Sequence, residues 1–283
     1  MDKADVQGAF SAAGLSRLLK DIDRISKPSI RLYTTHVEEY TLPIGASKLG
    51  GSPDLPAGVK WPEWKGLPQS FIAQIHLADV HPFDTEKLLP PTGMLWFFYD
   101  AQQQTFGAEP ADRGGWHIIF NKDEQTQLQR TSPPASLPSA AQFQPCTITF
   151  TSEITLSQQP QLEIPNFDWT AEEQQKYETL LSTFPTPADH ASPQNRLLGF
   201  PNTIQDDMRL QCQLTSHGIT DPNDPRVADL SKDAMSWQLL LQIDSDPQAG
   251  MRWADAGMLY YWIKQSDLQS HNFDNSWLVL QSD

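Results

Sequence analysis

The two halves of the chain carry the same series of motifs in the same order, and this repeat constrains the fold more than any other feature. Each series begins with a basic residue and a Gly-x-Pro turn: Lys48 before Gly51-Ser52-Pro53, and Arg196 before Gly199-Phe200-Pro201. A Gln-Ile pair, a Gly-Met-Leu sequence and a Trp-led apolar segment then follow in both halves, at 74–75, 93–95 and 116–120, and at 242–243, 257–259 and 277–280. About 19 residues separate the Gln-Ile and Gly-Met-Leu elements in the first half, and about 15 in the second. This match indicates a duplicated unit.

The repeated segments read as β-strands, because aromatic and β-branched residues dominate them. A repeated set of strands with one apolar face can bury that face against its own copy. We therefore predict an internally duplicated α+β fold with two pseudo-symmetric antiparallel-sheet halves and flanking helices. Residues 29–283 form one duplicated domain in this interpretation, with repeat one at about 29–157 and repeat two at about 158–283.

Two segments have the periodicity of amphipathic helices. Residues 1–28 are predicted to form an N-terminal helix that Pro28 ends, with an apolar stripe of Leu15, Leu18, Leu19, Ile22 and Ile25. A second helix begins near Thr170, which has capping-box spacing to Glu173. Asp224-Pro225 is expected to open a short third helix, and the rest of the C-terminal third is expected to be strands.

The bulk composition excludes several classes of protein. The formal net charge of −15 repels nucleic-acid phosphates and anionic membrane surfaces, and permits a basic protein partner. No apolar run approaches the roughly 18–20 residues that cross a bilayer, and the N-terminal residues do not have the pattern of a signal peptide. Cys146 and Cys212 stand far apart, so we expect two buried, reduced thiols. A cytoplasmic location follows from these features.

Several separate motifs carry a family resemblance. Residues 48–62 (KLGGSPDLPAGVKWP) and 67–80 (LPQSFIAQIHLADV) resemble the YwqG-like family of uncharacterised bacterial proteins, as do 196–212, 237–246 and 251–263. The resemblance implies an internally duplicated α+β bacterial protein, and it supplies no catalytic residues. Some members of that family are encoded near secreted-toxin loci, so the resemblance also implies an immunity or interaction role.

Carboxylates gather in the second repeat. Asp206 and Asp207 follow the Gly-x-Pro turn, Asp244 follows a strand, and Asp255 precedes Gly257. If the fold brings these loops together, the carboxylates could bind a divalent cation or act as acid and base. Their spacing does not fit an EF-hand loop. The alternative is structural, because aspartates at strand ends commonly accept hydrogen bonds from turn N–H groups.

Two further pairs of residues are candidate ligand-binding groups. Lys48 and Arg196 precede the two Gly-x-Pro turns, where each either binds an anion or pairs with an acidic residue of the other copy, such as Asp207 or Asp54. Trp61 and Trp64 lie in a Pro-rich loop rather than in an apolar strand, so they are candidates for an exposed recognition surface.

Three classes of function remain open. The chain has no GxSxG, HExxH, P-loop or GxGxxG motif, which favours a non-enzymatic protein. The leading hypothesis is an acidic protein-interaction module, such as a toxin-immunity protein with a basic partner. The second is a binder of a small molecule or peptide in the cleft between the repeats. The third is a carboxylate or divalent-metal enzyme; outside that hypothesis, no cofactor is expected.

Overall fold

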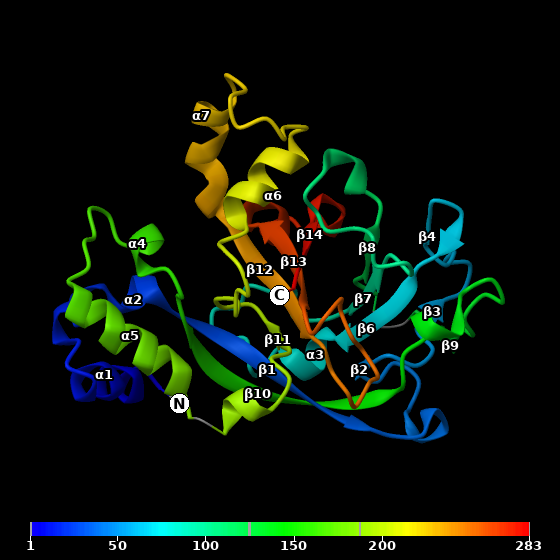
Figure 1. Cartoon of the computed structure of the whole chain (residues 1–283). Coiled ribbons are helices and arrows are strands. Elements are labelled where there is room, and N and C mark those ends of the chain that lie inside the picture. The colour runs from blue at the N-terminus through cyan, green and yellow to red at the C-terminus, as the bar shows by residue number, and fades with distance from the viewer. Residues whose placement is uncertain (1, 124–125, 187, 283) are drawn as a thin grey trace.

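The computed structural model describes residues 2–123, 126–186 and 188–282, and its centre is one ten-stranded antiparallel sheet (Figure 1). The strand order is β14-β13-β12-β11-β1-β10-β2-β6-β7-β8. The strands are β1 (Ser26–His36), β2 (Lys48–Leu49), β6 (Ser70–His76), β7 (Met94–Tyr99), β8 (Trp116–Asn121), β10 (Cys146–Leu156), β11 (Arg196–Leu197), β12 (Trp237–Asp244), β13 (Met258–Lys264) and β14 (Trp277–Gln281). We call β2-β6-β7-β8 the first arm and β11-β12-β13-β14 the second arm. The fold is thus mixed helix and sheet, as the sequence predicts.

The two long strands β1 and β10 lie at the centre of this order and pair with each other along their full length, from Ser26↔Leu156 to His36↔Cys146. β1, which precedes the first arm in the chain, hydrogen-bonds to β11 of the second arm. β10, which precedes the second arm, hydrogen-bonds to β2 of the first arm. Each long strand is therefore joined to the arm other than the one that follows it in the chain, as the crossing ribbons in Figure 1 show.

The register of the two arms is the same around their short strands. Lys48 pairs with Gln74 in the first arm, and Arg196 pairs with Gln242 in the second. A break in register lies just before each glutamine, between 71 and 73 and between 239 and 241. We call a residue of the first arm and a residue of the second arm matched when the first lies as many strand positions from Gln74 as the second lies from Gln242.

The main apolar core lies between the two arms, because the sheet curls until their inner faces meet. Phe97 of β7 packs against Tyr261 of β13 with ring centroids 5.2 Å apart, and Trp116 packs against Trp277 at 4.9 Å. The sheet is nearly closed at its outer edges. There the segment 106–107 lies along β14, where the Leu280 N–H donates to the Phe106 carbonyl at 3.2 Å.

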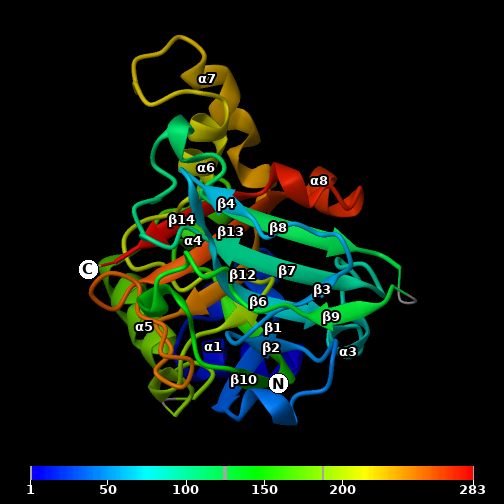
Figure 2. The same cartoon turned by 90° about the vertical axis from the view of Figure 1, so that its right-hand side faces the viewer.

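The helices gather outside the sheet in two groups (Figures 1 and 2). The first group has its own apolar core, built with Val6, Phe10, Leu18, Ile22, Tyr177 and Leu180, and comprises α1 (Lys3–Ala12), η1 (Ser16–Asp21), α2 (Ile22–Ile25), α4 (Pro160–Glu163) and α5 (Ala171–Thr183). The second group contains α6 (Arg209–Ser216), α7 (Val227–Leu230) and η6 (Ser231–Ser236).

The remaining short elements lie in the connections. Two strand pairs flank the first arm: β3 (Asp54–Pro56) with β9 (Leu128–Arg130), both labelled in Figure 2, and β4 (Glu63–Trp64) with β5 (Leu67–Pro68). The other helices are α3 (Leu77–Val80), α8 (Gln265–Gln269), η2 (Glu39–Thr41), η3 (Pro110–Asp112), η4 (Ser139–Ala141), η5 (Asp189–Ala191) and η7 (Phe273–Asn275).

The N-terminal segment differs from the single helix that its periodicity suggests. Gly14 has φ +73°, which ends the first helical stretch, and the chain continues as η1 and α2. β1 begins at Ser26, so Pro28 lies within a strand instead of ending a helix. The apolar stripe still faces inward, because Leu15, Leu18, Ile22 and Ile25 are all buried.

Other expectations agree with the structure. Cys146 and Cys212 are free and buried, and burial raises the pKa of the Cys146 thiol to about 12. In the described parts of the chain, no helix is long and apolar enough to cross a bilayer. Helix α6 was not expected, since its sequence alternates polar and apolar residues too irregularly to distinguish it from the strands nearby.

The capping box of α5 is formed as the sequence predicts, and it gives a first testable prediction. The Thr170 hydroxyl accepts from the Glu173 N–H at 3.2 Å, and the Glu173 carboxylate accepts from the Thr170 N–H at 3.2 Å. Thr170→Ala should lower the free energy of unfolding by about 1 kcal/mol in urea titrations, since the first turn loses its acceptor. Thr179→Ala, also exposed on α5, is the control; an equal loss in both variants would contradict the capping role.

Candidate functional site

A buried glutamine organises the Gly-x-Pro turn in each arm. Gln74 accepts a hydrogen bond from the Asp54 N–H at 2.8 Å and donates to the Asp54 carboxylate at 2.8 Å. Gln242 accepts from the Asn202 N–H at 2.9 Å and donates to the Asn202 side-chain oxygen at 3.2 Å. Asp54 and Asn202 each follow the proline of their turn, so the turns are held by the same contacts in both arms.

The basic residues before the turns also have matched contacts. The Lys48 ammonium donates to the Ser52 carbonyl, and the Arg196 guanidinium donates to the Phe200 carbonyl at 3.3 Å. Both side chains are buried. A buried charge needs hydrogen-bond or ion-pair partners, and these contacts supply them. The structure thus places both candidate residues beneath their turns. The predicted pairing across the two copies is not formed: Lys48 contacts Asp54 of its own half, and Asp207 contacts Arg209.

In the first arm, the residues around the turn form a closed ion-pair network. Lys48 contacts Glu39 at 2.9 Å and Asp54 at 3.6 Å, and Arg130 of β9 contacts Asp54 at 2.9 Å and Glu39 at 3.4 Å. Burial disfavours the Asp54 carboxylate, but hydrogen bonds from Arg130 and from the Gly45 N–H outweigh it and lower the Asp54 pKa. Two cations and two carboxylates balance one another, and this network is structural in character.

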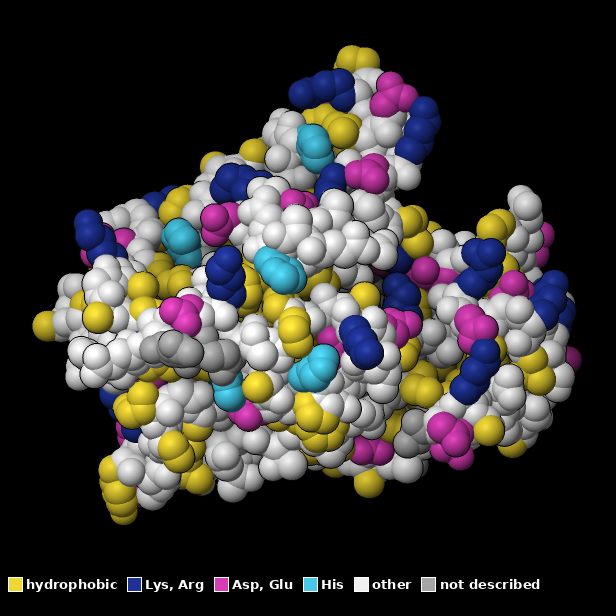
Figure 3. All heavy atoms as spheres, turned by 180° about the vertical axis from the view of Figure 1, so that it is seen from behind, with side chains coloured by type: hydrophobic (Ala, Val, Ile, Leu, Met, Phe, Trp, Pro, Cys, Tyr) yellow, Lys and Arg dark blue, Asp and Glu magenta, His cyan; other side chains and the backbone are white. Residues whose placement is uncertain are grey.

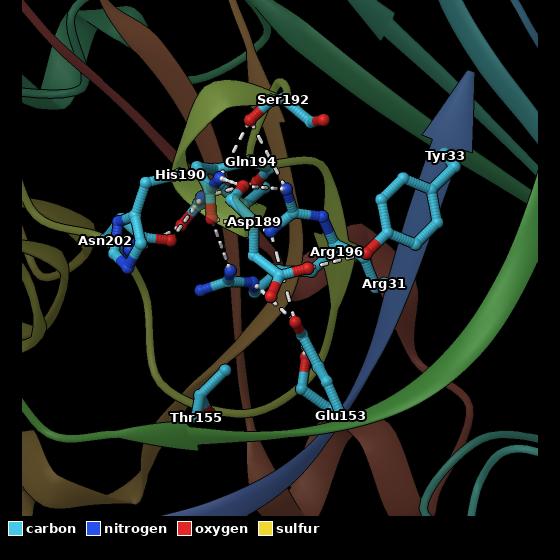
Figure 4. A network of polar contacts seen from close by, with 12 residues as sticks. Arg31, Tyr33, Glu153, Thr155, Asp189, His190, Ser192, Gln194, Arg196 and Asn202 are labelled. Atoms are coloured by element: carbon cyan, nitrogen blue, oxygen red, sulfur yellow. Dashed lines mark hydrogen bonds and ion pairs between the residues drawn. The ribbon is translucent and has the colours of Figure 1, made fainter. Parts of the chain in front are cut away.

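In the second arm, two arginines replace the lysine–arginine pair, and Figure 4 shows the polar contacts around them. Arg196 contacts Glu153 of β10 at 3.0 Å, and its Nη2 donates to the Gln194 side-chain oxygen at 3.0 Å. Arg31 of β1 donates to the same oxygen at 2.5 Å and to the Pro193 carbonyl at 2.9 Å. Asn202, where the first arm has a carboxylate, receives no cation among the described residues.

A cleft of about 350 Å³ opens beside these residues, between β10, α5 and the loop that precedes β11. We call it the arginine cleft. Its polar wall includes Glu153, Asp189, His190, Gln194, Arg196 and Asn202, and its apolar wall includes Ile154, Leu181, Phe184 and Pro185. This volume lies in the range of small-molecule sites, which combine apolar walls with a few convergent polar groups.

Hydrogen-bonding capacity remains unused at this cleft. The Nε of Arg31, which contacts the cleft residue Gln194, is buried without a hydrogen-bond partner, and the buried Nε of Arg196 lies 3.0 Å from a Glu153 oxygen without hydrogen-bond alignment. Burial lowers the pKa of Arg196 and raises that of Asp244, whose carboxylate accepts from the Gln194 N–H at 2.7 Å behind the cleft. Buried polar groups are nearly always satisfied in folded proteins, so an unpaired donor beside a cleft is unusual.

The candidate carboxylates lie in different surroundings. Asp207 pairs with Arg209 at 2.8 Å, Asp255 is exposed and contacts Arg252 at 3.3 Å, and Asp206 is exposed. Asp244 is half-buried at the end of β12, where it accepts turn N–H groups. Over residues 2–123, 126–186 and 188–282, no group of three or more His, Cys, Asp or Glu side chains could hold a metal ion. The carboxylates therefore form no common site there.

The two candidate tryptophans are half-buried and packed against the first arm. The Trp61 ring lies 5.5 Å from the Phe98 ring, and its indole N–H donates to the Gln69 carbonyl at 2.8 Å. Lys65 lies over the Trp64 ring at 5.0 Å. Their role in recognition stays a prediction.

Several cleft residues were missed by sequence reasoning. Glu153 and Arg31 sit in alternating strands, and nothing local distinguishes them from other charged strand residues. Asn202 could have been found, because it follows Gly199-Phe200-Pro201 as Asp54 follows Gly51-Ser52-Pro53. An alignment of the two turns would have identified this exchange of carboxylate for amide.

Comparison with known proteins finds a family whose function is unknown. Curated proteins include no match to the chain. A family model described as "Domain of unknown function (DUF1963)" matches residues 47–282, which cover both arms and the whole arginine cleft. Since this match extends over most of the chain, the protein belongs to the DUF1963 family.

Proposed function

We propose that the protein is a non-enzymatic binder of a small polar molecule, which occupies the arginine cleft. One observation carries the proposal: the first arm closes its turn with Arg130 and Asp54, whereas the second arm has Asn202 and an open cleft at the matched place. The Asn202 amide, the Arg196 guanidinium and the Glu153 carboxylate offer both donors and acceptors. Leu181 and Phe184 offer apolar surface, so a ligand with polar groups on one side fits the cleft.

We also infer that the two arms descend from one duplicated unit and that the chain is a YwqG-like member of its family. The order of strands, the paired glutamines and the two breaks in register support the duplication. On this proposal β10 is the counterpart of β1, so the second unit begins near residue 146 instead of 158. The supports for the YwqG-like, bacterial identity are the sequence motifs described above.

The acidic interaction module, with a toxin or another basic protein as partner, remains an alternative proposal that rests on the net charge of −15. On the face in Figure 3, Lys and Arg side chains are interspersed with Asp and Glu side chains. A basic partner would therefore need to select a more uniformly acidic area elsewhere. The cytoplasmic location belongs to the same set of proposals.

The ligand-binding proposal can be tested by filling the cleft. Leu181→Trp enlarges an apolar wall residue, and Gln174→Trp adds the same ring to an exposed position of the same helix that lines no described cleft. The full chain and both variants are screened by thermal unfolding against a library of polar metabolites. We expect compounds that raise the Tm of the unaltered chain and of Gln174→Trp by several degrees, and that leave Leu181→Trp unchanged.

Two results would overturn the proposal. A library without any stabilising compound would argue against a small-molecule site. Equal stabilisation of Leu181→Trp would place the ligand elsewhere. Because the tryptophan could itself disturb α5, the unfolding midpoint of each variant without ligand is compared first.

A further inference from the structure

We propose that a second, smaller pocket binds a carboxylate group between the Lys27 ammonium and the side-chain N–H groups of Gln238 and Trp262. The pocket lies on the other side of the 199–203 loop from the arginine cleft, and its ligand is independent of the one proposed for that cleft. It has a volume of about 20 Å³. A site of that size holds one atom about as large as a water molecule, so it takes one oxygen at the charged end of a ligand.

Two of its donors are buried without partners. Trp262 of β13 is 2% exposed, and its indole Nε1 makes no hydrogen bond. The amide Nε2 of Gln238, on the neighbouring strand β12, is also buried and unpaired. Both residues line the pocket. A buried donor without an acceptor costs about 1–3 kcal/mol, so two such groups on one pocket call for an explanation.

The third donor is a cation without a carboxylate of its own. Lys27 lies near the start of β1, lines the pocket, and holds its Nζ 4.6 Å from the centre of the Phe200 ring. Among the described residues, no hydrogen bond or ion pair involves this ammonium. Burial lowers the pKa of Lys27, as expected for an ammonium beside aromatic walls.

Asp207 and Arg209 also line the pocket, and they are paired with each other. Arg209 of α6 contacts Glu163 at 2.7 Å and Asp207 at 2.8 Å. Glu163, Glu86 and Asp207 favour the charged form of Lys27 from a distance, and Glu163 and Asp207 are both committed to the arginine. Lys27 is therefore the cation that remains for an incoming anion.

At the matched place in the first arm, aromatic side chains pack against each other. There Phe98 stands where the second arm has Trp262, and the Trp61 ring packs edge-on against it. Ser70 stands where the second arm has Gln238. The first arm fills this space with an aromatic ring, whereas the second arm leaves a hollow with nitrogen donors around it.

The chemistry of these donors selects the ligand. An ammonium, an indole N–H and an amide N–H can all give hydrogen bonds, so the ligand must supply acceptor oxygens. One positive charge in the group matches the single negative charge of a carboxylate, and charge-assisted hydrogen bonds are the stronger kind. A free small acid and the C-terminus of a peptide both carry this group, and the two sources can be distinguished by experiment.

The indole resonances of the full chain provide a direct test. The nine tryptophans give separate indole N–H signals in a ¹H–¹⁵N spectrum, and Trp262→Phe assigns the one of interest. Sodium acetate is titrated against sodium chloride at equal ionic strength, followed by a short peptide with a free or an amidated C-terminus. We expect acetate to shift the Trp262 signal to a plateau, and chloride to leave it in place. Tighter binding of the free-terminus peptide than of acetate would identify a peptide ligand; equal or weaker binding would identify a small acid.

Variants give the decisive comparison. Lys27→Met should weaken acetate binding at least tenfold, Lys27→Arg should retain part of it, and Lys20→Met, which removes an exposed lysine, should have no effect. The other indole signals report whether each variant is folded. Leu181→Trp should leave acetate binding unchanged, so failure at the arginine cleft and failure here are distinguishable. Equal shifts with chloride, or unchanged binding in Lys27→Met, would mean an ordered water or an adventitious ion only, and would overturn the proposal.

Discussion

Lys48→Met is expected to lower the free energy of unfolding by about 3–5 kcal/mol, one of the two largest effects that we predict for a single substitution. The Lys48 side chain is fully buried, and its ammonium lies between Glu39 and Asp54. Methionine keeps most of the length of the side chain but removes the charge, so the buried Asp54 carboxylate loses a cation that water cannot replace, and the partly exposed Glu39 carboxylate loses the same partner. Urea titration followed by tryptophan fluorescence measures the loss.

Two further variants separate the lost ion pairs from lost packing. Lys60→Met, at an exposed position of the same region, should change the stability by less than about 0.5 kcal/mol. Adding Asp54→Asn to Lys48→Met should recover part of the loss, since Asn202 shows that the turn accepts an amide at the matched place. If the double variant loses the sum of the two single effects, the pairing of Lys48 with Asp54 does not explain the loss.

Gly107→Ala is the second substitution with a large expected effect. Gly107 has φ +74°, and a Cβ at this position would overlap the Leu278 carbonyl of β14. The same glycine accepts a hydrogen bond from the Trp277 indole at 2.9 Å and donates its N–H to Asp112 at 2.9 Å. The substitution should cost about 3 kcal/mol or more from backbone strain and steric overlap together, measured as a fall in Tm and in the urea midpoint.

Gly58→Ala is the matched control for this substitution. Gly58 has φ +85°, but no atom lies within 4 Å of the place where its Cβ would be. It should therefore show only the conformational cost of alanine at positive φ, about 1 kcal/mol. Equal losses at both positions would show that the contact of segment 106–107 with β14 contributes nothing to stability.

The strands and the α5 helix could be read from the sequence because their signals are local. The apolar runs at 94–99 and 237–244 form strands, and the Thr170 capping box starts a helix where its spacing places it. The N-terminal helix was interrupted because Gly14 adopts a positive φ, which the periodicity of its neighbours does not reveal. Helix α6 has its apolar contacts with β12 and β14, and such tertiary contacts are not visible in a local window.

The sites were harder to predict than the fold. Arg196 was identified from its place in the repeat, but its partner Glu153 lies on β10 and comes from another part of the sequence. Lys27 and Trp262 meet at one pocket only because β1 pairs with β11 across the centre of the sheet. An unpaired hydrogen-bond donor can be recognised only in the folded structure, because nothing in the sequence around these side chains distinguishes them.

The pairing of each long strand with the other arm has a consequence for synthesis on the ribosome. β1 leaves the ribosome early, yet one of its two neighbours, β11, begins at Arg196. Until then one edge of β1 is unpaired, and an unpaired strand edge can join another chain. Contacts so distant in sequence also make folding slow. We therefore expect nascent chains that stop before β11 to depend on chaperones or to associate with one another.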